Sequence, residues 1–218
     1  MTQETLGYSL VKTGDYQDKA FIMIHGWQGN KDSFKTIVNL LGISNCTWYF
    51  PEAPYMIEGN PDKRTWAREV SPGEWEVEKA KKLLKLFIKD KVLSKYDSND
   101  VFIMGFSQGA AVCYELILSF DYPLGGIFPI AGFMRDFPGA TDKISLDSPP
   151  KQQNTPILIG HGKDDDIVFL EASEKAYNLL KQYCRNIELY IYNGRHKIGI
   201  EYLKKVKEMV AGKKEHIQ

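Results

Sequence analysis

The fold is decided by the stretch Val101-Phe102-Ile103-Met104-Gly105-Phe106-Ser107-Gln108-Gly109-Ala110-Ala111-Val112-Cys113. An apolar run typical of a buried strand enters the motif Gly-x-Ser-x-Gly, and a helical pattern of small apolar residues follows it. The two glycines of the motif leave room for a sharp turn, because a Cβ at either position would collide as the chain doubles back. The stretch therefore predicts a strand, a tight turn that exposes the Ser107 hydroxyl, and a helix whose free N-terminal amides favour negative charge.

The same alternation of short apolar runs and helical patterns continues over most of the chain. The expected strands are Ala20–Ile24, Thr47–Phe50, Val101–Met104, Gly126–Ile130, Ile157–Ile159 and Ile187–Tyr192, and the expected helices are Ser33–Leu41, Glu74–Leu93, Gln108–Phe120, Leu170–Tyr183 and Ile200–Val210. Nearly continuous apolar strands are typical of strands buried on both faces, and their alternation with helices indicates parallel βαβ units. The sequence therefore predicts an α/β fold whose mostly parallel central sheet is flanked by helices on both faces.

The length of the chain fits one α/β domain, since such domains often exceed 200 residues. We therefore expect a single domain over residues 1–218. Two proline-containing stretches, near residues 51–73 and 133–156, show no strand or helix pattern. Loops of this length inside a domain commonly form the walls or lids of sites, so both are expected to be irregular loops that line a site.

Composition excludes several classes of protein. The chain has 28 basic and 28 acidic residues, whereas a nucleic-acid binder carries a net basic patch. Its three cysteines are too few and too scattered for a disulfide framework or a thiolate metal site, and no histidine motif has metal-ligand spacing. The first residues lack the pattern of a signal peptide, and no run approaches the roughly 18 apolar residues of a membrane span. We expect a cytoplasmic protein with no bound metal.

A serine nucleophile needs a general base, and the chain offers four histidines. His216 lies in a polar tail. His25 and His161 each precede a glycine directly after a strand, where the ring can hold loop backbone in place. His196 follows the strand at 187–192, and open α/β sheets place their sites at the carboxyl ends of strands. His196 is therefore the candidate base.

Two further groups complete the chemistry of a serine hydrolase. The acid is expected between serine and histidine in the chain, where Asp164, Asp165 and Asp166 follow a strand, and their spacing does not choose among them. The tetrahedral oxyanion needs two backbone N–H donors. One is that of Gln108, the residue after the nucleophile, and the other comes from the loop after the strand at 20–24, most directly from Trp27.

With these residues the chain resembles the phospholipase/carboxylesterase family of α/β hydrolases, which includes acyl-protein thioesterases and small bacterial carboxylesterases. The resemblance is carried by Ile22-Met23-Ile24-His25-Gly26, Phe50-Pro51-Glu52-Ala53-Pro54, Gly105-Phe106-Ser107-Gln108-Gly109-Ala110, Ile130-Ala131-Gly132-Phe133, Thr155-Pro156-Ile157 through His161-Gly162, and His196. It implies a single-domain α/β-hydrolase fold and serine esterase activity that needs no cofactor. The family's acid loop, H-G-x-x-D-x-x-V, falls on residues 161–168 and selects Asp165 as the acid.

Two departures from the family pattern stand close to the expected site. Where the family has a small hydrophobic residue followed by Gly-Asp, this chain has Trp27-Gln28-Gly29-Asn30. The indole ring of Trp27 would crowd the oxyanion side of the site. Arg195 separates Gly194 from His196, whereas the family's histidine often follows a glycine directly.

The expectation is a serine carboxylesterase that hydrolyses acyl esters, with thioesters as a further substrate class, through an acyl-enzyme. Its catalytic residues would be Ser107, Asp165 and His196, its oxyanion donors the amides of Trp27 and Gln108, and its substrate-binding residues Phe133, Val168 and Trp66, which resembles a tryptophan of the family's acyl pocket. The substrate would be a small acyl ester, and the protein a monomer or homodimer. The alternative is a non-catalytic protein of the same fold that binds a small acyl ligand.

Overall fold

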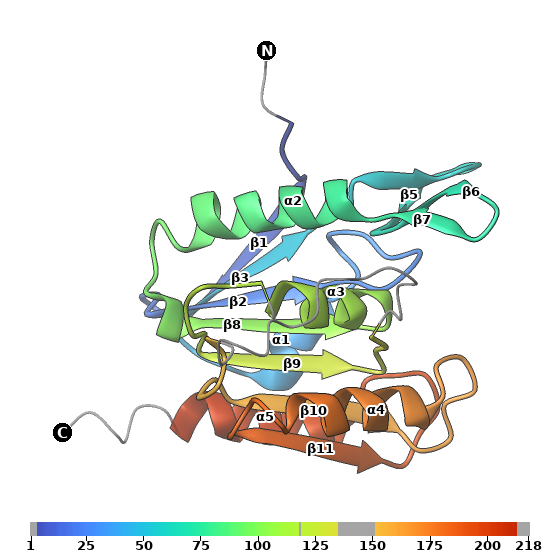
Figure 1. Cartoon of the computed structure of the whole chain (residues 1–218). Coiled ribbons are helices and arrows are strands. Elements are labelled where there is room, and N and C mark those ends of the chain that lie inside the picture. The colour runs from blue at the N-terminus through green and yellow to red at the C-terminus, as the bar shows by residue number, and fades with distance from the viewer. Residues whose placement is uncertain (1–3, 118, 135–150, 213–218) are drawn as a thin grey trace.

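A computed structural model describes residues 4–117, 119–134 and 151–212 of the chain (Figure 1). Its main sheet has seven strands in the order β1-β3-β2-β8-β9-β10-β11. These are β1 (Tyr8–Thr13), β2 (Lys19–Ile24), β3 (Cys46–Pro51), β8 (Val101–Phe106), β9 (Gly126–Ile130), β10 (Ile157–Gly162) and β11 (Ile187–Tyr192). Each neighbouring pair is parallel except β1 with β3, so the prediction of a mostly parallel sheet is confirmed.

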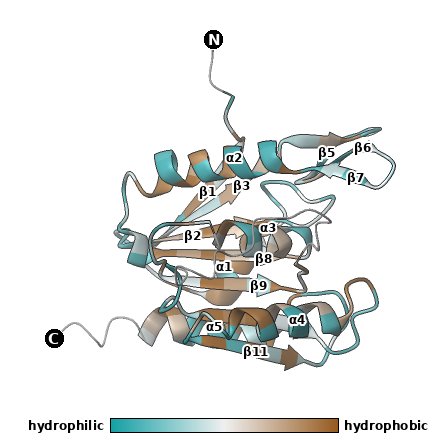
Figure 2. Ribbon diagram, viewed as in Figure 1, coloured by the Kyte–Doolittle hydropathy of each residue, from teal (hydrophilic) through white to brown (hydrophobic). Residues whose placement is uncertain are grey.

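Helices cover both faces of this sheet, as predicted (Figure 1). In the view of the figure, α2 (Glu78–Phe87), α3 (Gln108–Ile117) and α4 (Leu170–Leu180) lie in front of it, and α1 (Lys35–Leu41) and α5 (Ile200–Ala211) lie behind it. A hydrophobic core lies on each face of the sheet, and successive strand residues pack into opposite cores. Ile22 of β2 belongs to the cluster that contains Leu84 of α2, whereas its neighbour Phe21 belongs to the cluster that contains Leu203 of α5. Figure 2 shows this as hydrophobic colour along the inner strands and mixed colour on α2.

The prediction of an irregular loop at residues 51–73 is wrong. The stretch contains β4 (Tyr55–Ile57), β5 (Asn60–Thr65) and β6 (Arg68–Ser71), which form two hairpins, β4 with β5 and β6 with β7 (Glu74–Glu76). The side chains of these hairpins are mostly exposed or half-buried, so the hairpins depend on their turns rather than on burial. For the same reason, no apolar run marks these strands in the sequence.

The same turn chemistry shortens the expected helix at 74–93. Gly73 has a φ of 79°, which turns the chain back into β7, and α2 begins only at Glu78. After α2, residues Ile88–Val92 form one π-helical turn, and a short 3₁₀ turn, Ser98–Asp100, precedes β8. Of the second expected loop, at 133–156, residues 135–150 lie outside the described part of the chain.

The edge strand β1 was not expected from the sequence. Its residues alternate between exposed and half-buried, and two of its apolar side chains, Tyr8 and Leu10, are among the exposed ones. An edge strand of this kind lacks the continuous apolar run of the inner strands, so the pattern that identified the others does not detect it.

The parallel arrangement brings four loops together at one edge of the sheet, because the carboxyl ends of β2, β8, β10 and β11 all reach it. These are the loops that carry the candidate site residues. Within the described residues, no helix has the length and apolar character needed to cross a membrane.

Candidate active site

The turn between β8 and α3 has the sharp geometry that its sequence predicts. Ser107 adopts a left-handed φ of 54°, and its amide donates a hydrogen bond to the carbonyl of Ile130 at 2.8 Å. A Cβ at Gly105 would lie 2.4 Å from the carbonyl oxygen of Gly109, and one at Gly109 would lie 2.2 Å from that of Ile24. Both motif positions therefore require glycine, and the close approach fixes the N-terminus of α3 against the end of β2.

Ser107, His196 and Asp165 lie in a row of hydrogen bonds across this edge of the sheet. Ser107 Oγ is 3.0 Å from His196 Nε2, and His196 Nδ1 is 2.7 Å from Asp165 Oδ2. The ring of Phe106 packs against the imidazole, with 4.8 Å between the ring centroids and a tilt of 44° between the ring planes. The loops after β8, β10 and β11 thus bring together three residues that are far apart in the sequence.

Of the three adjacent aspartates, only Asp165 faces inward. Its side chain is fully buried, and its Oδ1 accepts hydrogen bonds from the backbone N–H groups of Ile167 at 2.9 Å and Val168 at 3.0 Å. Asp164 and Asp166 are exposed. The structure therefore brings to His196 the same aspartate that the family resemblance selects.

Arg195, which separates the glycine from the histidine, points away from this row. Its side chain is 72% exposed and forms an ion pair with Asp166, whose pKa lies below its ordinary value chiefly because of the hydrogen bond from Arg195. The backbone N–H of Asp164 also donates to the carbonyl of Gly194 at 2.9 Å. The acid and base loops are therefore joined, but a surface ion pair of this kind contributes little to stability.

The loop after β2 lies against the serine turn. A Cβ at Gly26 would be 3.4 Å from the Cβ of Ser107, so the backbone of this loop is next to the nucleophile position. Within the described part of the chain, neither the Trp27 nor the Gln108 N–H has a protein acceptor, which leaves both free to bind an oxyanion. Trp27 is 62% exposed, so most of the residue faces solvent, whereas its sequence position predicted an indole that crowds the oxyanion side.

His25 holds this loop from beneath, as its position after a strand predicts. The buried ring donates from Nδ1 to the carbonyl of Gly26 at 2.8 Å and accepts at Nε2 from the N–H of Ala53 at 3.1 Å. The indole Nε1–H of Trp66 donates to the His25 carbonyl at 2.8 Å. His25 thus joins the loop after β2 to the segment after β3.

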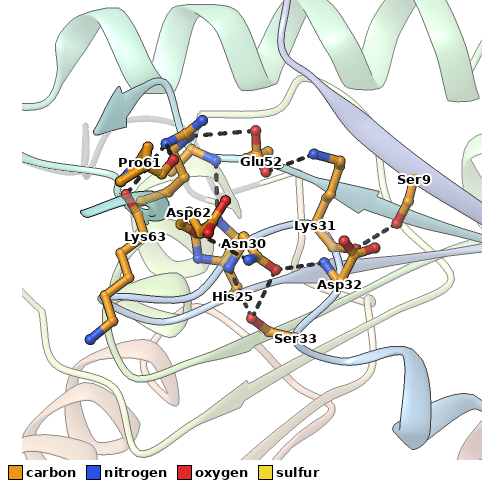
Figure 3. A network of polar contacts seen from close by, with 12 residues as sticks. Ser9, His25, Asn30, Lys31, Asp32, Ser33, Glu52, Pro61, Asp62 and Lys63 are labelled. Carbon is orange, nitrogen blue, oxygen red and sulfur yellow. Dashed lines mark hydrogen bonds and ion pairs between the residues drawn. The ribbon is translucent and has the colours of Figure 1, made fainter. Parts of the chain in front are cut away.

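The hairpin β4–β5 fixes the other side of the loop (Figure 3). The N–H of Gln28, at a φ of 64°, donates to the Arg64 carbonyl, and the Arg64 N–H donates to the Gly29 carbonyl, both at 3.0 Å. Glu52 accepts ion pairs from Lys31 at 3.1 Å and Arg64 at 3.4 Å. Burial acts to raise the pKa of Glu52, but the hydrogen bond and charges of these two partners outweigh it and hold the pKa below its ordinary value. No local sequence pattern indicates this network, because it joins segments that are far apart along the chain.

The burial of His25 predicts a loss of stability in mild acid. Burial lowers its pKa from 6.5 to about 4, so the unfolded chain binds this proton at a higher pH than the folded one. Stability from this residue is therefore complete above pH 6.5 and falls by about 3 kcal/mol as pH decreases to 4. Urea unfolding at a series of pH values should show this decrease in the native protein and lack it in His25→Gln. Parallel curves for the two proteins would contradict the assignment.

The three residues expected to bind substrate differ in exposure. Trp66 is fully buried, so it presents no surface to solvent. Its backbone N–H donates to the side-chain Oε1 of Gln108 at 3.0 Å, and its indole contacts the loop after β2 through the His25 carbonyl. Phe133 and Val168 are half-buried. A hollow of about 480 Å³ beside α4 is lined in part by their sequence neighbours Met134 and Phe169. The described residues contain no cluster of histidine, cysteine and carboxylate side chains that could hold a metal ion.

A parallel α/β sheet that presents serine, histidine and aspartate in hydrogen-bonding order at its carboxyl edge defines the serine hydrolases of the α/β-hydrolase fold. Residues 7–213 match the phospholipase/carboxylesterase family, and the chain belongs to that family. It is 29% identical to carboxylesterase SOBER1 of Arabidopsis thaliana over 77% of each chain. It is also 26% identical to acyl-protein thioesterase 1 of Debaryomyces hansenii, over 89% of this chain and 90% of the relative. The crystal structure of Arabidopsis SOBER1 superposes with a TM-score of 0.74 at 24% identity, over 90% of this chain and 99% of the other.

Proposed function

We propose that this protein is a serine carboxylesterase that hydrolyses acyl esters, and thioesters by the same chemistry, through a covalent acyl-enzyme. The observation that carries the proposal is the row of contacts at 3.0 and 2.7 Å that links Ser107 through His196 to the buried Asp165. Membership of the phospholipase/carboxylesterase family supports it.

In the first half of the reaction, Ser107 Oγ attacks the substrate carbonyl while His196 Nε2 removes the hydroxyl proton. Asp165 keeps the Nδ1 proton of His196 in place and stabilises the imidazolium. The N–H groups of Trp27 and Gln108 bind the oxyanion, and the loss of one such donor typically raises the barrier by roughly 3–4 kcal/mol. Collapse of the tetrahedral intermediate breaks the bond to the alcohol or thiol, which leaves with the proton from His196.

In the second half, water replaces the leaving group. His196 removes a proton from the water, whose oxygen attacks the acyl carbonyl, and the same two amides bind the second oxyanion. The C–O bond to Ser107 then breaks, the serine recovers its proton from His196, and the carboxylic acid departs. No group outside the chain other than water is needed for this sequence.

The surroundings of the row favour an apolar acyl group. Phe133 and Val168 are half-buried at this edge of the sheet, and Trp27, Ile167 and Phe169 expose apolar surface on the two neighbouring loops. We propose that Phe133 and Val168 contact the acyl chain, and that Trp66 supports the pocket from beneath. A cytoplasmic location and a monomeric or homodimeric state remain predictions from the sequence.

A series of p-nitrophenyl esters with acyl chains of two to sixteen carbons tests the proposal. We expect turnover with a maximum at one chain length, and turnover of the matching S-acyl thioester. Ser107→Ala, with circular dichroism to verify its fold, serves as the control and should show no turnover. If the well-folded native protein hydrolyses none of these substrates, the proposal is wrong, and the acyl-binding alternative is favoured.

A further inference from the structure

The buried carboxylate of Asp165 has a second histidine beside it. His161, near the end of β10, is fully buried, and its Nε2 lies 3.4 Å from Asp165 Oδ2, the same oxygen that accepts from His196. Because His161 is shielded from solvent, it has no route to a substrate. The proposed mechanism uses His196 alone, so the role of this second ring needs its own explanation.

The hydrogen bonds of His161 define its tautomer. Its Nε2 lies 2.8 Å from the carbonyl oxygen of Val168, which can only accept, so Nε2 carries a proton. Its Nδ1 lies 2.7 Å from the hydroxyl of Ser173 on α4, whose next acceptor, the Gly132 carbonyl, is more distant at 3.5 Å. The hydroxyl therefore donates to a bare Nδ1, and both ring nitrogens have partners in the neutral form.

These contacts close a ring of interactions around the acid. Val168 donates its N–H to Asp165 Oδ1 at 3.0 Å and gives its carbonyl to His161, and the shared Nε2 proton of His161 also faces Asp165 Oδ2. Each oxygen of the Asp165 carboxylate therefore has an N–H donor from this part of the fold nearby, that of Val168 at Oδ1 and that of His161 at Oδ2. Without His161, the Val168 carbonyl would lose this donor and Asp165 Oδ2 would lose a neighbouring N–H, so the carboxylate could rotate away from His196.

We propose that His161 is a positioning residue, which fixes the rotamer of Asp165 and the loop at 165–168 so that Asp165 can orient His196. The inference rests on the proposed function, because it concerns how the geometry of Ser107, His196 and Asp165 is maintained. Because His161 acts through Asp165 and touches no substrate, its loss should lower kcat and leave KM nearly unchanged.

Two amide variants, which place an N–H at the position of one ring nitrogen each, separate this role from a merely structural one. The amide N–H of His161→Gln replaces the proton at Nε2, whereas that of His161→Asn reaches only the position of Nδ1. We expect kcat of His161→Asn to fall about 10- to 100-fold, the loss typical when a partner that orients a metal-binding histidine is removed. His161→Gln should retain kcat within about threefold of the native value.

Thr155→Ala is the matched control, since Thr155 is equally buried, just before the opposite end of β10, and also makes two hydrogen bonds through its side chain. It should lower the midpoint of thermal unfolding without changing kcat at temperatures where the protein is folded. Equal kcat values for the Asn and Gln variants, or a loss confined to KM, would overturn the proposal. If the native protein has no esterase activity, the proposed function fails instead, so the two failures are distinguishable.

A measurement on the native protein does not depend on the folding of any variant. Long-range ¹H–¹⁵N spectra of the histidine rings should show His161 protonated at Nε2 and bare at Nδ1. The opposite tautomer would break the bond to Val168 and overturn the proposal. In His161→Asn, the far-downfield resonance of the His196 Nδ1 proton should weaken or shift, whereas it should persist in His161→Gln.

Discussion

Ester hydrolysis by Ser107→Ala is expected to be lost almost completely, with kcat reduced by about 10⁶-fold, as when the serine of such a triad is removed. The substitution removes the only atom that can attack the carbonyl, so no acyl-enzyme forms. Among the described residues the hydroxyl forms a hydrogen bond only with His196, and the left-handed φ of 54° is as unfavourable for alanine as for serine. The fold should therefore persist with an unchanged unfolding midpoint.

Steady-state kinetics and thermal unfolding of the same preparation test this prediction. Ser94→Ala is a suitable control, because Ser94 donates its hydroxyl to the Asp90 carbonyl before β8 begins, whereas Ser107 follows the other end of that strand. It should retain full activity. If Ser107→Ala kept more than about one per cent of native kcat, with the fold intact, Ser107 would not be the nucleophile.

The second large effect is expected at Asp165. Asp165→Asn should lower kcat by about 10⁴-fold, since an amide facing Nδ1 favours the wrong tautomer of the catalytic histidine. The variant would leave His196 Nε2 protonated and unable to remove the proton of Ser107. The backbone donors of Ile167 and Val168 would still meet an amide oxygen at Oδ1, so the loop should keep its shape.

The two neighbouring aspartates are the internal controls for this experiment. Asp164→Asn and Asp166→Asn should change kcat less than about threefold, because both side chains are exposed and that of Asp166 is paired only with the exposed Arg195. Measurement of kcat for the three variants under one set of conditions is sufficient. Equal losses at all three positions would show that the acid is not Asp165.

The parts of the fold that could be predicted from the sequence are those built by burial. The inner strands are continuous apolar runs because helices cover both of their faces, and the helices between them repeat their apolar residues on one side. Strand β1 and the hairpins β4–β5 and β6–β7 could not be predicted in this way. Their pairing depends on turns such as that at Gly73 and on exposed or half-buried side chains, which leave no apolar pattern.

The residues of the candidate site likewise fall into those that the sequence predicts and those that it does not. Ser107 is identified by a local motif, and His196 by its place after a strand, because both follow from the order of elements along the chain. Spacing alone did not choose Asp165, since the direction of three adjacent carboxylates depends on the fold, and only the family resemblance selected it. The hydrogen bond from the Trp66 backbone N–H to the Gln108 side chain and the ion pairs of Glu52 join segments far apart in sequence, so no local pattern indicates them.

The proposal that Ser107 is an activated nucleophile is tested most directly by its covalent labelling. The native protein would be incubated with a short-chain fluorophosphonate, which reacts with activated serines, and then analysed by intact mass and peptide mapping. We expect a single adduct on Ser107, absent from Ser107→Ala and formed much more slowly by Asp165→Asn. A native protein that stays unlabelled while folded, or that carries the adduct on another residue, would contradict the assignment of Ser107 and with it the proposed esterase mechanism.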